Sequence, residues 1–133
     1  YVRGWKAARG MGLRVWQRNL LPRCSSTDSF STPTNQTPSA NFVPTGSSPR
    51  DVFNAWIQTQ VGVNIDGVID MASVFEDPAN PGKWKTDGTA NKWTSDGTHP
   101  TAFGHQQGAP AIADWCRLIR RFQKRDNTST LGF

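Results

Sequence analysis

The sequence predicts an α/β fold with a parallel sheet, and three segments carry this prediction. Leu13–Leu21 alternates between apolar and polar residues, and 65–75 is a short apolar run, so each is predicted to contain a strand. Between them, 49–57 has helical periodicity. Two strands joined through a helix pair in parallel. A parallel sheet needs several strands and cover on both faces, so we predict the C-terminal portion of a larger α/β domain that is marginally stable alone.

The N-terminal elements follow from local signals. Residues 1–10 are predicted to form the end of a helix that stops at Gly10, and the strand in Leu13–Leu21 is predicted to end at Pro22, which cannot donate to a ladder. Residues 23–48 are rich in Ser, Thr, Pro, Asn and Gln and are predicted to be a long irregular loop.

A helix is predicted from Ser48 as N-cap and Pro49 at its first position, with Gly62 beyond its end. Its apolar stripe comprises Val52, Phe53, Trp56 and Ile57. The second strand is predicted from about Gly67 to Met71, buried, and residues 76–97 are predicted to be irregular.

The strongest helical pattern covers Ala109 to Lys124, with Pro110 in its first turn. The residues predicted to face inward are Ile112, Trp115, Cys116, Ile119 and Phe122.

Composition excludes several classes of protein. A chain of 133 residues suits one domain, no apolar run is long enough for a membrane span, and two cysteines exclude a disulfide scaffold or a four-ligand zinc site. The net charge is +5, with basic clusters in 1–23 and 117–125. Because no nucleic-acid-binding motif accompanies them, we interpret these clusters as solvated edges and predict no nucleic-acid partner. The first residue is Tyr1 rather than Met, so we expect the chain to be processed, trimmed or part of a longer protein.

The segment with chemical potential is Thr94–His105, in which Asp96 and His99 lie three residues apart in a predicted turn. An Asp at this spacing can accept a hydrogen bond from one ring nitrogen of the His, which leaves the other nitrogen available as a general base. The alternative is an Asp that caps a turn beside a surface His. Spacing alone leaves both open.

The pattern Asp96-x-x-His99-Pro100, followed by Gly104 and a helix, resembles the C-terminal motif of the SGNH, or GDSL, esterase and lipase family. Further stretches resemble parts of that family in the same order along nearly the whole chain: 20–23, 52–57, 66–70 and 77–81.

The resemblance implies that 1–133 is the C-terminal part of one SGNH hydrolase domain, a three-layer α/β/α flavodoxin-like parallel-sheet domain. It implies hydrolysis of a carboxylic ester through an acyl-enzyme, with His99 as general base and Asp96 orienting it, no cofactor and no metal. The substrate stays open among acylated sugars, lipids and simple aryl esters. The protein is expected, from its two N-x-S/T sequons, to be secreted or extracellular.

The family's nucleophile block (Gly-Asp-Ser) and its Gly-x-Asn-Asp block do not occur in this sequence. The serine and the oxyanion residues are therefore expected in a missing N-terminal segment, in cis or as a separate chain. The alternative is a non-catalytic SGNH-like or binding module that lacks the nucleophile.

Several other residues have side chains that could belong to a site. Ser29, in an Asp-Ser-Phe stretch, is a poor nucleophile candidate because it lies in a polar loop, where turn chemistry explains it better. His105 is expected to pack at the start of the last helix rather than bind a metal, and Asp70 to cap a strand end. Trp84 and Trp93 are either pocket walls or core.

Two covalent features stay open. Cys24 and Cys116 form a disulfide only if their Cα atoms lie within about 7 Å. The sequons Asn35–Thr37 and Asn127–Ser129 suit glycosylation in a secreted protein.

Overall fold

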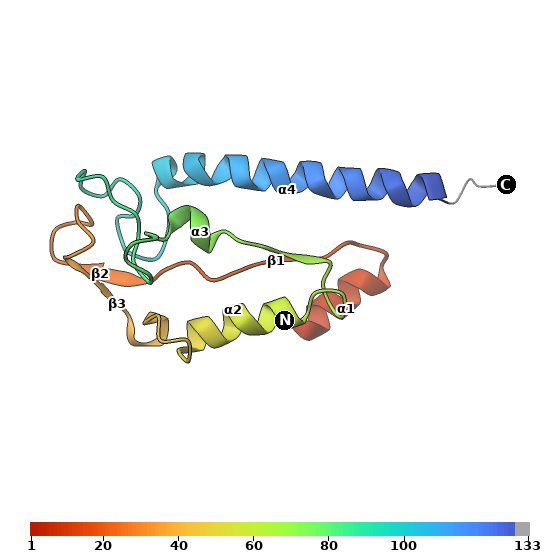
Figure 1. The fold of residues 1–133 in the computed structure, drawn as a ribbon, viewed down its shortest axis with the longest axis horizontal. Coiled ribbons are helices and arrows are strands. Elements are labelled where there is room, and N and C mark those ends of the chain that lie inside the picture. Colours follow the sequence, from red (N-terminus) through yellow and green to blue (C-terminus); the bar gives the residue numbers. More distant parts are fainter. Residues whose placement is uncertain (130–133) are drawn as a thin grey trace.

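The structure, a computed structural model, describes residues 1–129, and side chains are described up to Ile119 of the last helix. The elements in chain order are α1 (Val2–Gly10), β1 (Trp16–Arg18), β2 (Cys24–Ser26), β3 (Gln36–Pro38), the 3₁₀ turn η1 (Ala40–Phe42), α2 (Pro49–Thr59), β4 (Gly67–Ile69), α3 (Ala72–Phe75) and α4 (Ala102–Ser129). Helices α1 and α2 lie on one side of β1 and β4, and α4 on the other (Figure 1). The predicted α/β class is confirmed at this level.

The central sheet pairs β1 with β4 in parallel, with Gln17 opposite Val68. This confirms both predicted strands and their parallel pairing across a helix. Each is shorter than predicted, at three residues. After β1 the backbone turns toward α2, where the Leu20 N–H donates to Asn54 Oδ1 at 2.7 Å. Within the described residues no third strand joins this sheet, and two strands are too few to define a three-layer domain.

Helix α2 begins as predicted, because the Ser48 Oγ accepts a hydrogen bond from the Asp51 N–H at 3.2 Å. Ile57 is completely buried, and Phe53 and Trp56 pack beside it. The prediction for Val52 is wrong, since its side chain is 54% exposed. It lies about 100° from Phe53 around the helix axis, outside the face that α2 turns to the sheet.

Residues 23–48 are not an irregular loop, contrary to the prediction. Strands β2 and β3 form an antiparallel hairpin within them, with Ser25 opposite Thr37. Its polar residues give no alternating apolar pattern. Instead, the buried Gln36 side chain donates to the Trp84 carbonyl at 3.0 Å and accepts from the Trp84 N–H at 2.9 Å. The hairpin is therefore fixed by tertiary hydrogen bonds.

Helix α4 begins seven residues before the predicted Ala109, so Pro110 lies inside it rather than in its first turn. Proline removes one intrahelical hydrogen bond at that point. The inner face of α4 is built from Gly104 and Gly108, which are buried. A Cβ added at either glycine would lie within 3.6 Å of the Phe75 ring.

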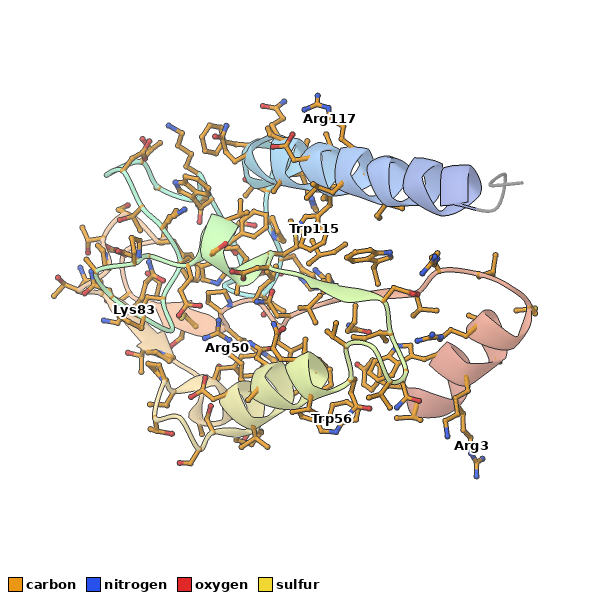
Figure 2. The ribbon with its side chains drawn as sticks, turned by 45° about the vertical axis from the view of Figure 1, so that its right-hand side comes forward. Arg3, Arg50, Trp56, Lys83, Trp115 and Arg117 are labelled. Atoms are coloured by element: carbon orange, nitrogen blue, oxygen red, sulfur yellow. The ribbon has the colours of Figure 1, made fainter. Side chains whose placement is uncertain are left out.

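Farther along α4, Trp115 packs edge-on against Trp16 of β1, with ring centroids 4.9 Å apart. Figure 2 shows Trp115 pointing from α4 toward the sheet. The predicted inward positions Ile112 and Cys116 are instead exposed. The helical period was predicted correctly, but the inner face is set by glycines, which an apolar pattern does not detect. The predicted position Phe122 lies outside the described side chains.

Two buried clusters stabilise the chain. The first lies between α1, α2 and the sheet and comprises Trp5, Ile57, Ile65 and Val68. The second lies under the loops at the carboxyl ends of the strands and comprises Cys24, Phe30, Met71, Phe75 and Trp84. The short helix α3, which the sequence did not predict, contributes Phe75 to it.

Candidate active site

The turn that carries Asp96 and His99 belongs to the loops gathered at the carboxyl ends of β1 and β4 (Figure 1). The carbonyl of Gly97 accepts two hydrogen bonds at 3.0 Å, one from the Cys24 N–H and one from the Trp84 indole N–H. Gly97 has a φ of +70°, and a Cβ there would lie 1.8 Å from the Cys24 carbonyl oxygen. Only glycine fits, so the turn is anchored directly to the chain that follows β1.

The structure brings Asp96 and His99 together. His99 Nδ1 lies 2.8 Å from Asp96 Oδ2. The other carboxylate oxygen accepts backbone N–H bonds from Thr98 and His99, both at 2.8 Å. With Nδ1 donating to the carboxylate, a neutral imidazole carries its free lone pair on Nε2. The His99 side chain is 77% exposed, so Nε2 is open to a reactant.

The pKa of Asp96 is held well below its ordinary value of 3.8. The His99 side chain is the main cause, and the backbone N–H groups of His99 and Thr98 add to it. Hydrogen bonds donated to a carboxylate favour its charged form. Asp96 is therefore ionised at neutral pH and able to stabilise a positive charge on His99.

A third residue, Thr94, shapes the turn from inside. It is completely buried, its Oγ1 donates to the His99 carbonyl at 2.8 Å, and this Oγ1 in turn accepts a hydrogen bond from the Gly97 N–H at 2.9 Å. Thr94 is not among the residues predicted for the site, because its position two residues before Asp96 gives no signal of burial. Thr94 positions the backbone of His99, not its ring.

The two tryptophans near the turn have different roles. Trp84 is completely buried and belongs to the core, so the pocket-wall option is wrong for it. Trp93 is partly buried and packs edge-on against Phe103 at 5.2 Å between ring centroids. Its carbonyl also accepts the Thr101 N–H at 3.0 Å, which closes the turn onto the start of α4.

No serine hydroxyl hydrogen-bonds to His99 in the described part of the chain. Ser29 is exposed, in a bend between β2 and β3, with a φ of +56°. The adjacent Asp28 accepts hydrogen bonds from Ser26, Thr32 and Asn35. The surroundings of Ser29 are thus those of a hydrogen-bonded turn and not of a strand-to-helix nucleophile elbow.

The two remaining polar candidates, His105 and Asp70, form hydrogen bonds within the fold. His105 lies in the first turn of α4, as expected, and its N–H donates to the Thr101 carbonyl at 2.9 Å. Its side chain is exposed, so the prediction that it packs there is wrong. Asp70, directly after β4, accepts hydrogen bonds at its Oδ1 from Asn19 Nδ2 at 2.7 Å and from the Ser73 N–H at 3.2 Å. Among the described residues no three His, Cys, Asp or Glu side chains are grouped to hold a metal ion.

The cysteines do not pair, because Cys24 is buried at the start of β2 and Cys116 is exposed on α4. Burial raises the pKa of the Cys24 thiol to about 11, and its Sγ contacts the Gly82 carbonyl at 3.1 Å. In the first sequon Asn35 is exposed, and its amide donates to Asp28 at 3.1 Å. The side chains of the second sequon lie outside the described ones.

A cleft of about 420 Å³ lies between α2 and the segment after β4, a feature that the sequence did not reveal. Arg50 lines this cleft, although only 4% of its surface is exposed. Its guanidinium is paired with the Glu76 carboxylate, and its Nε donates to the Leu20 carbonyl at 3.2 Å. Figure 2 places Arg50 between α2 and the loops, so it ties these parts together.

The basic residues lie mainly on the surface. Arg3 and Arg117 point away from the body of the molecule (Figure 2). Arg14 pairs with Asp66 at 3.0 Å and Arg117 with Asp114 at 2.6 Å. No helix in the part that the structure describes has the length and apolar character required to cross a bilayer.

The sequence matches no model of a known protein family, and no curated protein is significantly similar to it.

Proposed function

We propose that this chain supplies the histidine and aspartate of a serine ester hydrolase of the SGNH type. The observation that carries the proposal is the 2.8 Å contact between His99 Nδ1 and Asp96 Oδ2, combined with an exposed Nε2. Its position at the carboxyl ends of parallel strands supports it, since α/β folds place ligands there. The resemblance of Asp96–Pro100 to the family motif supplies the type of reaction.

In the proposed reaction, His99 Nε2 takes the proton of a serine hydroxyl as its oxygen bonds to the ester carbonyl carbon. The imidazolium then gives this proton to the leaving alcohol, and an acyl-enzyme forms. Water repeats the sequence, and the carboxylic acid leaves. Asp96 keeps the proton of the neutral ring on Nδ1 and stabilises the imidazolium, and its low pKa keeps it ionised throughout.

The serine and oxyanion donors of this reaction would come from polypeptide beyond Tyr1, in cis or as a separate chain. An acylated sugar or a lipid would be the ester, and the protein would be secreted. The 1–133 segment would then be the C-terminal part of a three-layer flavodoxin-like hydrolase domain.

A second candidate is a non-catalytic module. It is favoured by the absence of a serine hydroxyl bonded to His99 in the described residues, and by the two backbone N–H bonds that Asp96 accepts. These two bonds stabilise the turn whether or not His99 acts as a base, so Asp96 has a structural role under both candidate functions.

Ester hydrolysis by the complete protein tests the proposal. With p-nitrophenyl acetate, we expect His99→Ala to lose about 10⁶-fold in turnover, as removal of the triad histidine does in a serine protease. Asp96→Asn should lose about 10⁴-fold, as the equivalent substitution does in the serine-protease triad. His105→Ala is the matched control, because it lies six residues away in the same segment and should change turnover little.

A fluorophosphonate, which reacts with activated serines, separates this mechanism from hydrolysis by an exposed imidazole. We expect it to abolish the activity of the wild-type protein. Circular dichroism should show the same fold in all variants. If His99→Ala keeps near-normal turnover, or if the fluorophosphonate has no effect, the second candidate replaces the first.

A further inference from the structure

We propose that Thr94 is the positioning residue of the general base: through the backbone of the turn, its buried hydroxyl keeps the His99 ring paired with the Asp96 carboxylate. The inference rests on the proposed function, since a base is needed only for that reaction. It goes further by naming the side chain that keeps the base in place. The contacts of Asp96, of Thr94 and of Gly97 carry it in turn.

The pair of Asp96 and His99 lies at the surface and is not held by its own contact. The two side chains are 52% and 77% exposed. A contact between exposed charged or polar side chains stabilises little, because water competes for both partners and ordering them costs entropy. The 2.8 Å distance between His99 Nδ1 and Asp96 Oδ2 therefore depends on the backbone that brings the two residues together.

The Thr94 hydroxyl holds this backbone at two points. Its Oγ1 donates to the His99 carbonyl at 2.8 Å and accepts from the Gly97 N–H at 2.9 Å. The same oxygen lies 3.4 Å from Asp96 Oδ1, longer than a good hydrogen bond between oxygens. That carboxylate oxygen already accepts two backbone N–H groups. The hydroxyl proton therefore belongs to the carbonyl, and one side chain ties Gly97 to His99.

The hydroxyl itself has a fixed place in the fold. Thr94 is completely buried, and an antiparallel bridge joins its backbone to that of Pro100 at the far end of the turn. The Gly97 peptide is also held on its other side, since its carbonyl accepts from the Cys24 N–H and the Trp84 indole N–H. The turn is thus fixed from inside, and its exposed side follows.

Loss of the hydroxyl should release the ring before the rest of the turn. The Gly97 N–H, in a buried residue, would lose its acceptor. An unpaired buried donor costs more than an opened surface contact, so the backbone between Gly97 and His99 should move at the expense of the Asp96 contact. A neutral ring released from the carboxylate no longer keeps its proton on Nδ1, and some molecules then lack the free lone pair on Nε2.

The state of the His99 ring can be measured without reference to activity. In the complete protein labelled with ¹⁵N-histidine, the ring nitrogen shifts give the fraction of neutral rings that carry the proton on Nδ1. His105 is the other histidine of this sequence and provides an internal reference. We expect Thr94→Val to lower the fraction at His99, and Thr94→Ser to preserve it because serine keeps the hydroxyl. The signals of His105 should not change.

The same variants should separate in ester hydrolysis. With p-nitrophenyl acetate, Thr94→Val should lower kcat about 10–10²-fold, the scale of a misplacement of about 1 Å in an active site. KM should change little, because the buried Thr94 does not reach the substrate. Thr94→Ser should keep most of the wild-type kcat.

Thr101→Val is the matched control, because this threonine also makes two hydrogen bonds through its hydroxyl. Thr101 Oγ1 donates to the Lys92 carbonyl and accepts from the Gly104 N–H at 3.2 Å. Both partners lie outside the segment from Asp96 to His99. Thr101→Val should therefore leave the ring state and kcat close to those of the wild type.

Thr94→Ala is a second variant in case Thr94→Val loses the fold, which circular dichroism checks. Its smaller side chain leaves room for water to accept from the Gly97 N–H. A water molecule is not tethered to the chain, so the same direction of change at His99 is expected. If both variants unfold, the hydroxyl stabilises the whole domain and the specific role in positioning His99 is refuted.

The remaining outcomes also decide the inference. Wild-type ring state and kcat in Thr94→Val overturn it, and equal losses in Thr101→Val overturn it as a general disturbance of the segment. A lower kcat with an unchanged ring refutes the route through His99. If the ring responds as expected but the wild-type protein hydrolyses no ester, Thr94 holds the ring as inferred and the proposed function alone fails.

Discussion

The two ends of the molecule differ in how completely their polar groups are hydrogen-bonded and their apolar side chains are buried. At the carboxyl ends of the strands, the loops and the β2–β3 hairpin bury polar groups that all have partners, such as Gln36 and Thr94. Around the sheet, where the regular helices and strands lie, apolar side chains are exposed instead: Leu13, Val63, Ile112 and Leu118. The helices and strands around the sheet are therefore the part of this chain that leaves apolar side chains exposed.

The difference has a physical origin. The hairpin and the loops form hydrogen bonds with one another, as Gln36 does with Trp84, so they need no additional layer. A parallel sheet closes its hydrogen bonds only with further strands, and helices on its faces can be buried only by a sheet of matching width. The loop end holds the Asp96–His99 turn in one conformation, while the sheet end leaves apolar side chains exposed.

The largest stability effect is expected at Trp84, the centre of the loop end. Trp84→Ala removes a completely buried ring and the indole hydrogen bond to Gly97. A loss of about 3–5 kcal/mol is expected, as for other buried aromatic truncations. Hydrogen exchange at the Cys24 amide, which bonds to Gly97, measures the free energy of opening. Trp93→Ala, at a partly buried ring, should cost less, and equal losses would contradict the distinction between them.

A slightly smaller effect is expected where the two ends meet. Glu76→Ala leaves the buried Arg50 guanidinium without its carboxylate partner, which typically costs about 3–5 kcal/mol, reduced here because Glu76 is partly exposed. Thermal unfolding measures the loss of stability, and the Leu20 amide serves as the local reporter. The control is Asp87→Ala, which breaks the exposed pair with Lys92 and should cost at most about 1 kcal/mol. Similar losses in both variants would show that Arg50 does not join the two ends.

A moderate effect is expected at the sheet end. Ser48→Ala removes the N-cap of α2 and should cost about 1 kcal/mol. Hydrogen exchange at Val52, whose N–H bonds to the Ser48 carbonyl at 2.9 Å, reports on the first turn of the helix. Ser47→Ala is the matched control, because Ser47 does not cap the helix. If Ser47→Ala opens α2 as much, the cap assignment is wrong.

The smallest effect is expected from acid. Hydrogen bonds, chiefly from Thr32, lower the pKa of Asp28, and those from His99 lower the pKa of Asp96. A depressed folded-state pKa stabilises the fold above the ordinary value of 3.8, and this stabilisation is lost as the pH falls through the lower folded value. Below about pH 4, after correction for intrinsic rates, the amides of Ser31 and Thr98 should open more easily.

The amide of Asn19 in the sheet ladder offers the internal reference for this measurement, since it bonds to the Ile69 carbonyl rather than to a carboxylate. Its opening free energy should fall less over the same pH range. An equal fall at all three amides would mean that acid unfolds the whole chain, and that the loop carboxylates have no separate effect.

The sequence by itself determined the features that depend on local patterns: helices α1 and α2, the Ser48 cap, the two parallel strands and the spacing of Asp96 and His99. Each rests on residues within one turn or one strand, so periodicity and capping chemistry are sufficient to predict it. Only the tertiary structure decided the β2–β3 hairpin, because Gln36 reaches Trp84, 48 residues away, to hold it.

Tertiary contacts also decided which face of α4 is buried and how the Asp96–His99 turn is anchored. The inner face of α4 is made by Gly104 and Gly108, where the absence of a side chain permits close approach to Phe75. The anchor is the Gly97 carbonyl, which accepts from Cys24 and Trp84. Close backbone approach and long-range hydrogen bonds depend on where the chain returns in space, and hydropathy along a sequence does not encode that return.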